Sequence, residues 1–246
     1  MRVSLQFDAN APIVLPRSYN HEIQGFIYRN LPAEDAAKLH NRGFPYEKRT
    51  FKLFTFSRIQ GVYTIDYAKQ TISFEPPVVL KIASPIEWIL QGMVEGLLRR
   101  QTSFLGKNEL VLRHIQVEIP PDLTSPLKIE MLSPMTVYTT YRKPDGRKRV
   151  DYYSPFEADF AQQISDNLCK KYLLVHGEPI SAEVQLKPLF SGSRERNIRF
   201  KQSFFKAWDG IYRLDGDPEL IQVAYDCGLG AKNSMGFGMW EKKSVR

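Results

Sequence analysis

The sequence feature that most constrains the fold is a group of prolines near the middle of the chain. Pro120, Pro121 and Pro126 lie close together there. Because proline fixes φ and has no backbone donor, helices and strands rarely run through such a stretch. The chain has 246 residues, which is enough for two domains of ordinary size. We therefore expect a linker here, between one domain of residues 1–122 and another of residues 123–246.

The first half combines strand and helix patterns in a definite order. Alternating polar and apolar residues predict strands, and apolar residues three and four apart predict helices. The expected strands are 3–7, 49–57, 71–82 and 109–119, and the expected helices are 20–31, 33–40 and 84–100. If the short helix 33–40 is set aside, the order is βαββαβ.

The second half repeats this order. The expected strands are 127–140, 181–190, 198–213 and one from 237, with helices at 155–175 and 217–227 and a basic hairpin tip at 141–149. Two such units predict an α+β protein of two tandem ferredoxin-like (RRM-like, βαββαβ) domains. Each would carry a four-stranded sheet covered on one face by two helices. Sheets of this kind commonly bind RNA.

Composition narrows the class of partner and the compartment. The formal net charge is +7, from 34 lysines and arginines against 27 acidic residues, and it suits a polyanionic partner. Cys169 and Cys227 are too few for a disulfide framework, and the amino-terminal residues lack the apolar core of a signal peptide. No apolar run approaches the ~20 residues that cross a bilayer. We expect a cytoplasmic protein with no membrane partner.

The segment CGLGAKNSMGFGMWE, residues 227–241, is the most unusual in composition. Glycine allows close backbone approach and positive φ, so an exposed loop of this kind could turn its N–H groups toward a phosphate. Its G-x-G-x5-G-x-G spacing fits neither a dinucleotide fingerprint nor a P-loop, which disfavours a nucleotide-binding protein. A plain turn remains the alternative. The candidate RNA-binding residues are Gly228, Gly230, Lys232, Asn233, Ser234, Gly236 and Gly238.

Four motifs together resemble a known family. They are YNHEIQGFIY (19–28), KLHNRGF (38–44) leading into FKLFTFS (51–57), MLSPMTV (131–137) and GLGAKNSMGFGMW (228–240). In this order they resemble the CRISPR-associated endoribonucleases that cut precursor CRISPR RNA within its repeats, members of the RAMP superfamily. The resemblance spans the whole chain. It implies tandem ferredoxin-like domains and a metal-independent transesterification that needs no cofactor.

The resemblance also implies partners and an active site. The partners are CRISPR repeat RNA and subunits of CRISPR effector complexes, with the protein as a monomer or homodimer. The implied catalytic residues are Tyr28, His40 and Lys52. A non-catalytic RAMP-type protein that holds CRISPR RNA in an effector complex is the competing interpretation, since fold and charge do not separate the two.

The three side chains suit RNA cleavage because RNA supplies its own nucleophile, the 2′-hydroxyl. His40 would transfer a proton, Tyr28 would take the complementary role or orient the hydroxyl, and Lys52 would stabilise the pentacoordinate phosphate. The apolar stripe of the predicted helix 20–31 is formed by Ile23, Phe26, Ile27 and Leu31, and Tyr28 lies off it. Lys52 is expected on an apolar strand face with Phe54 and Phe56. His21, His114 and His176 are expected to be structural.

Two basic groups could follow an RNA backbone, although solvated surface charge is the ordinary alternative. The first lies at the hairpin tip and includes Arg147, Lys148 and Arg149. The second, around the strand from 198, includes Arg194, Arg196, Arg199 and Lys201. No metal site is expected, because the four histidines are isolated in sequence and Asp215-Gly-Asp217 has the pattern of a turn.

Overall fold

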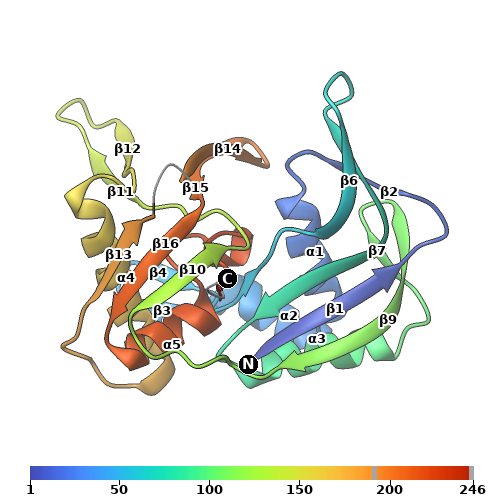
Figure 1. Ribbon diagram of the computed structural model, residues 1–246, viewed down its shortest axis with the longest axis horizontal. Coiled ribbons are helices and arrows are strands. Elements are labelled where there is room, and N and C mark those ends of the chain that lie inside the picture. The colour runs from blue at the N-terminus through green and yellow to red at the C-terminus, as the bar shows by residue number, and fades with distance from the viewer. Residues whose placement is uncertain (190–192, 244–246) are drawn as a thin grey trace.

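Two antiparallel sheets, one from each half of the chain, form the framework of the protein (Figure 1). The structure is a computed structural model that describes residues 1–189 and 193–243. Residue 190, the last of the predicted strand 181–190, and residues 244–246 of the predicted second domain lie outside the described residues. In the described part, no helix is both long and apolar enough to cross a membrane.

The first sheet has the ferredoxin-like strand order. Its central strand β1 (Arg2–Asp8) pairs with β7 (Thr71–Ala83) on one side and β9 (Asn108–Glu118) on the other, and β7 pairs in turn with β5 (Thr55–Phe56). In the register of these strands, Leu5 of β1 lies opposite Leu80 of β7 and Ile115 of β9. Along the chain, helix α1 (Asn20–Asn30) lies between β1 and β5, and helix α3 (Glu87–Leu98) lies between β7 and β9. The predicted βαββαβ order is therefore confirmed.

Three short strands extend this sheet beyond the prediction. They are β2 (Ile13–Pro16), β6 (Gln60–Asp66) and β8 (Ser103–Leu105). β6 and the start of β7 form a hairpin that projects from the body of the protein (Figure 1). β6 escaped prediction because it is largely exposed and carries no alternating apolar face.

The second sheet repeats the same order. β10 (Leu127–Met131) is central, with β16 (Ile211–Gly216) on one side, β17 (Trp240–Lys242) on the other, and β13 (Val184–Pro188) beyond β16. Helices α4 (Ala158–His176) and α5 (Pro218–Cys227) complete the unit. Asp217 caps α5 by accepting from the N–H groups of Glu219 and Leu220. The fold is a tandem of two ferredoxin-like units.

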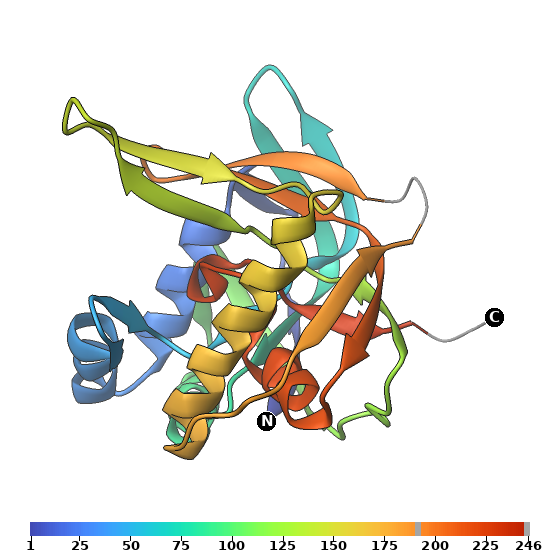
Figure 2. The same cartoon turned by 90° about the vertical axis from the view of Figure 1, so that its left-hand side faces the viewer.

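Three of the predicted strands are divided in the structure. Segment 127–140 becomes β10 and β11 (Tyr138–Arg142), which pairs with β12 (Lys148–Tyr152) in a projecting hairpin (Figure 2). Segment 198–213 becomes the hairpin of β14 (Arg194–Phe200) and β15 (Ser203–Asp209), followed by β16. Alternation of polar and apolar residues with a period of two does not distinguish one long strand from two strands joined by a tight turn.

Segment 49–57 is divided as well. β4 (Arg49–Phe51) pairs with β3 (Phe44–Tyr46), and the chain then leaves the ladder before β5. Leu53 has φ 51°, a left-handed conformation that ends strand geometry for a residue with a Cβ. The predicted helix 33–40 is α2 (Ala33–Ala37), which continues into a π-helical turn, η1 (Lys38–Arg42).

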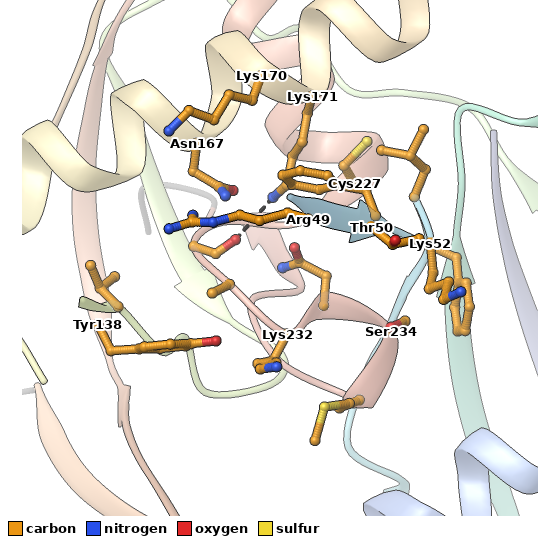
Figure 3. Close-up of a pocket in the computed structure, with 18 of the residues that line it drawn as sticks. Arg49, Thr50, Lys52, Tyr138, Asn167, Lys170, Lys171, Cys227, Lys232 and Ser234 are labelled. Atoms are coloured by element: carbon orange, nitrogen blue, oxygen red, sulfur yellow. Dashed lines mark hydrogen bonds between the residues drawn. The ribbon is translucent and has the colours of Figure 1, made fainter. Parts of the chain in front are cut away.

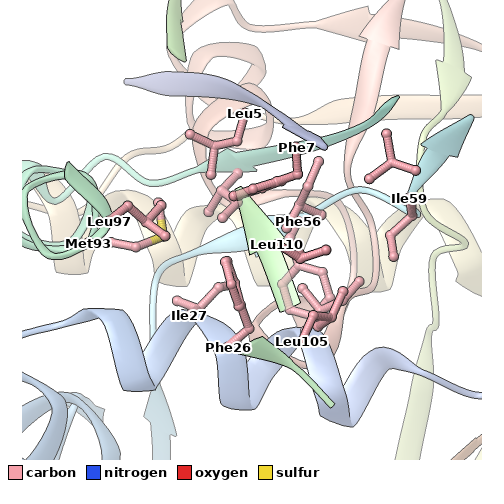
Figure 4. Close-up of a cluster of buried hydrophobic side chains, with 14 of the residues drawn as sticks. Leu5, Phe7, Phe26, Ile27, Phe56, Ile59, Met93, Leu97, Leu105 and Leu110 are labelled. Carbon is pink, nitrogen blue, oxygen red and sulfur yellow. The ribbon is translucent and has the colours of Figure 1, made fainter. Parts of the chain in front are cut away.

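Each sheet has its own buried core. In the first, Phe26 and Ile27 of α1 pack beneath Leu5 and Phe7 of β1, and the Phe7 and Phe26 rings meet edge to face at 5.5 Å (Figure 4). The apolar stripe predicted for α1 is therefore confirmed. Fully burying each such side chain contributes about 1.5–3 kcal/mol. The second core lies between its own sheet and helices α4 and α5.

Arg2 ties the first sheet to the second half. Its guanidinium is buried, lies 3.6 Å from the ring centre of Tyr225, and donates to the carbonyl oxygens of Tyr225 at 2.8 Å and Trp240 at 2.9 Å. The amino-terminal nitrogen lies beside it and donates to Asp226 at 3.0 Å. These charge-assisted bonds fix β1 against α5 and β17.

The glycine segment, which we define as residues 228–238, is buried between the two halves, so the expected exposed loop is wrong. Gly228, Gly230, Gly236 and Gly238 all have positive φ and are all buried. A Cβ on Gly238 would lie 1.9 Å from the carbonyl oxygen of Leu229. The composition correctly indicated close backbone approach, but the approaching atoms belong to the protein itself.

This packing predicts a large loss of stability for Gly238→Ala. The added Cβ meets backbone, so we expect the free energy of unfolding to fall by about 3 kcal/mol or more. Gly146→Ala is the matched control, because Gly146 also has positive φ (79°) but has nothing within 4 Å of its Cβ position. It should cost about 1 kcal/mol. Urea unfolding measures both, and equal losses would contradict this account of the segment.

Candidate active site

A cavity of about 670 Å³ lies between the two halves of the protein (Figure 3). Its walls come from α1, η1, β4, α4, the β11–β12 hairpin and the glycine segment. In the described part of the chain, no aspartate or glutamate lines it. Seven lysines and arginines do, and they are Lys48, Arg49, Lys52, Lys148, Lys170, Lys171 and Lys232. A cavity with this lining favours an anionic ligand.

Tyr28 enters the cavity from the last turns of α1. Its side chain is half-buried, and its ring packs edge to face against His40 at 5.8 Å and Phe54 at 6.0 Å. This position agrees with the prediction that the ring points away from the core stripe of its helix. Burial raises the pKa of the Tyr28 phenol to about 12. The hydroxyl therefore stays protonated at neutral pH and can donate a hydrogen bond.

His40 is presented by the π-helical turn η1 and is exposed at the edge of the cavity. Its Nδ1 lies 3.0 Å from Oδ1 of Asn41. Because an amide oxygen only accepts, Nδ1 carries the proton in this pair. Nε2 is then the ring nitrogen left to exchange a proton with a ligand.

Lys52 lies directly after β4, where the chain has left the ladder, so the prediction of an apolar strand face is wrong. Its Nζ donates to the carbonyl oxygens of Leu39 at 2.6 Å and His40 at 2.7 Å. An ammonium has three donors, so one remains available to a ligand. Burial lowers the pKa of Lys52. The structure thus brings Tyr28, His40 and Lys52 to one cavity.

Of the glycine-segment candidates, Gly230, Lys232, Asn233 and Ser234 line the cavity, whereas Gly228, Gly236 and Gly238 do not. Asn233 donates to Leu229 O and Phe237 O at 3.0 Å, so its amide is engaged within the segment. Lys232 is exposed and has φ 60°. Its ammonium is therefore the charged group that this segment presents to the cavity.

Two side chains of the first motif hold the glycine segment in place. Gln24 donates to Ser234 O at 2.7 Å, and Asn20 donates to Met235 O at 2.8 Å and Gly236 O at 3.1 Å. Asn20 is the first residue of α1 and does not cap it, because its side chain is engaged with the glycine segment. The motifs at 19–28 and 228–240 are in direct contact.

The two basic groups are placed differently from one another. In the hairpin, Lys148 lines the cavity, while Arg147 and Arg149 form ion pairs with Asp145 and Asp151. In the second group, Arg196 pairs with Asp209. The other members of that group are exposed and do not line the cavity: Arg194, Arg199 and Lys201. Phe200 of the same strand does line it.

The remaining histidines lie outside the cavity lining. The ring of His21 packs edge to face on Phe200 at 5.5 Å, His114 is exposed on β9, and His176 stacks on Tyr172 at 4.2 Å. In the described ranges, no group of three or more histidine, cysteine, aspartate or glutamate side chains is placed to hold a metal ion.

Lys171 is a residue of the site that the sequence interpretation missed. Its side chain is buried, and Nζ donates to Gly228 O at 2.7 Å and Gly230 O at 3.0 Å. Burial lowers its pKa to about 8. The available signal was its helical spacing, since Lys171 falls on the same face of α4 as the buried Ile164 and Leu168.

Arg49, Asn167 and Lys170 were missed as well, and all three line the cavity. Their sequence neighbourhoods carry no distinguishing motif. Arg49 lies in a short basic stretch with Lys48, and Asn167 and Lys170 are polar residues of an amphipathic helix. Only the packing of α4 beside the β3–β4 hairpin brings them together.

The strand orders and the cavity lining define a tandem ferredoxin-like protein with a cationic cavity between its units. A model of the family described as CRISPR associated protein Cas6, C-terminal, matches residues 118–242. This match covers half of the chain, and the chain belongs to the Cas6 family of CRISPR-associated proteins.

Similar proteins extend the relationship over almost the full length. The CRISPR-associated endoribonuclease Cas6 1 of Methanocaldococcus jannaschii is 28% identical over 243 residues, covering 97% of this chain and 91% of that protein. The CRISPR-associated endoribonuclease Cas6 of Pyrococcus furiosus is 27% identical over 245 residues, covering 94% of this chain and 85% of that protein. A solved structure described as CRISPR associated protein Cas6 matches with a TM-score of 0.81 and 28% identity over 99% of both chains.

The hydrogen bonds of Lys171 predict that replacing Lys171 destabilises the protein more than replacing its neighbour Lys170. In Lys171→Met, two buried carbonyl oxygens lose their donors, so we expect the free energy of unfolding to fall by about 2 kcal/mol. Lys170→Met is the control, because Lys170 is only half-buried and should cost less than about 0.5 kcal/mol. Urea unfolding at neutral pH checks both. Equal stabilities would show that water replaces the ammonium.

Proposed function

We propose that this protein is a metal-independent endoribonuclease that cuts CRISPR repeat RNA within precursor CRISPR RNA and so produces mature guide RNA. The observation that carries the proposal is the convergence of Tyr28, His40 and Lys52 on a cavity lined by seven cations. The similar proteins described as CRISPR-associated endoribonucleases support the same activity. Both proposed domains, 1–122 and 123–246, contribute walls to the cavity.

The proposed reaction is an internal transesterification. The 2′-oxygen of one nucleotide forms a bond to the adjacent phosphorus, and the bond from that phosphorus to the 5′-oxygen of the next nucleotide breaks. The 2′-hydroxyl loses a proton, and the leaving 5′-oxygen gains one. The products are a 2′,3′-cyclic phosphate and a 5′-hydroxyl. Side-chain proton transfer and charge stabilisation are sufficient for this chemistry.

The geometry supports a role for each side chain. His40 transfers a proton through Nε2, because Nδ1 is bonded to Asn41. The Tyr28 hydroxyl, protonated because its pKa is about 12, donates a hydrogen bond to the reacting oxygens. The third N–H of Lys52 stabilises the charge of the pentacoordinate phosphate. Lys52 also holds the backbone of His40, so one residue serves both the charge and the geometry.

Incubation of labelled repeat RNA with the purified protein in excess EDTA tests the proposal. We expect cleavage to persist and to leave a cyclic phosphate, because the reaction runs on side-chain acid and base. Loss of cleavage that a divalent ion restores, with RNA folding unchanged, would refute metal independence. Tight RNA binding without any cleavage would instead identify the non-catalytic RAMP-type protein, and the RNA would then be a cargo.

His40→Ala should slow single-turnover cleavage by roughly 10² to 10⁴-fold, the usual share of general acid–base catalysis. His21→Ala is the matched control, since His21 is also an exposed histidine but does not line the cavity. It should cleave at the wild-type rate. The reverse result, with His21→Ala inactive and His40→Ala normal, would show that the assignment of His40 is wrong.

Because burial raises the pKa of Tyr28, we expect the effect of replacing it to be the same across the pH–rate profile. The phenol keeps its proton at every pH well below about 12. Tyr28→Phe should therefore lower the rate by about 10 to 100-fold, through loss of one hydrogen bond to a charged group, at every pH from about 6 to 10. A rising limb toward high pH that is present in the wild type and missing in Tyr28→Phe would instead identify a phenolate base.

A further inference from the structure

One end of the cavity carries a second cluster of polar side chains, separate from Tyr28, His40 and Lys52. Lys170 and Asn167 reach it from α4 and Arg49 from β4, and Figure 3 shows these three together on the side of the cavity away from Lys52. We call this group the α4 cluster. Lys232 of the glycine segment lies across the cavity, with its Nζ 5.9 Å from the ring centre of Tyr138.

The cations of the α4 cluster have no carboxylate partner. Across residues 1–189 and 193–243, neither Arg49 nor Lys170 takes part in an ion pair, and neither does Lys232. Some arginines outside the cavity are neutralised locally, as Arg149 is by Asp151 and Arg196 by Asp209. Like charges that face one cavity without compensation raise the local potential and favour a bound anion.

Asn167 provides a second, independent observation. Its Oδ1 is buried and has no hydrogen-bond partner among the described residues. A buried amide oxygen without a donor costs about 1–3 kcal/mol, and this cost is relieved if the Asn167 amide turns its oxygen into the cavity and accepts from a ligand there. An RNA nucleotide supplies both complements, a phosphate for the cations and a 2′-hydroxyl that can donate to Oδ1.

We propose that the α4 cluster binds one nucleotide of the RNA substrate next to the cleaved linkage. Arg49 and Lys170 hold its phosphodiester, and the Asn167 amide turns so that Oδ1 accepts from its 2′-hydroxyl. This proposal rests on the proposed function, because it takes the ligand of the cavity to be RNA. The α4 cluster would position the substrate and favour RNA over DNA, while Tyr28, His40 and Lys52 carry out the chemistry.

Binding measured without cleavage tests the phosphate contacts. In a His40→Ala background, Arg49→Ala and Lys170→Ala should each weaken repeat RNA binding by about 10-fold, and each should lower the slope of log K against log salt by about 0.7. Lys107→Ala is the control, because Lys107 is an exposed lysine outside the cavity lining, and it should bind like the background protein. If the two cluster variants bind like Lys107→Ala, the proposal is overturned.

Single 2′-deoxy substitutions in the repeat RNA test Asn167. One position beside the cleavage site should weaken binding by about 5-fold in the background protein and have no effect once Asn167→Ala is added. A deoxy penalty that survives in Asn167→Ala at every position overturns this contact. Because both assays read binding, they remain decisive even if the wild-type protein proves not to cleave RNA. A failure of the proposed function and a failure of the α4 cluster are therefore distinguishable.

Discussion

The buried ammonium of Lys171 fixes the glycine segment, which forms one wall of the candidate active-site cavity. Nζ donates to the carbonyl oxygens of Gly228 and Gly230, just beyond the end of α5. Gln24 holds the far side of the segment through Ser234 O. The segment thus connects α4 to α1, so one set of buried bonds aligns the wall that carries Lys232 with the helix that carries Tyr28.

Among the described residues, the cations that line the cavity form no ion pairs with carboxylates. Ion pairs cover the hairpins and the outer surfaces, whereas the cations of the cavity face open space or bind backbone carbonyls. Lys52 does both, because the ammonium that faces the cavity also donates hydrogen bonds to Leu39 O and His40 O. In the proposed reaction its charge stabilises the pentacoordinate phosphate, while its hydrogen bond holds the backbone of His40.

Local sequence patterns determined the order of elements and much of their placement. The stripe of Ile23, Phe26 and Ile27 predicted the buried face of α1 correctly, and the proline group lies between β9 and β10, where the chain passes from the first sheet to the second. These features are visible in sequence because they depend on residues a few positions apart. The resemblance of the motifs also predicted that Tyr28, His40 and Lys52 belong to one site, and the cavity contains all three.

Only the tertiary structure decided what surrounds these residues. The glycines of 228–238 looked like an exposed ligand loop, but their neighbours include Thr136, Phe56 and Asn20, which come from other parts of the chain. Lys171 and Asn167 lie on one amphipathic helix, yet what each one contacts depends on how α4 packs. The sequence by itself determined the order of the main helices and strands and which residue types could do the chemistry. The contacts between distant segments, which local periodicity does not encode, decided the position of each charge in the cavity.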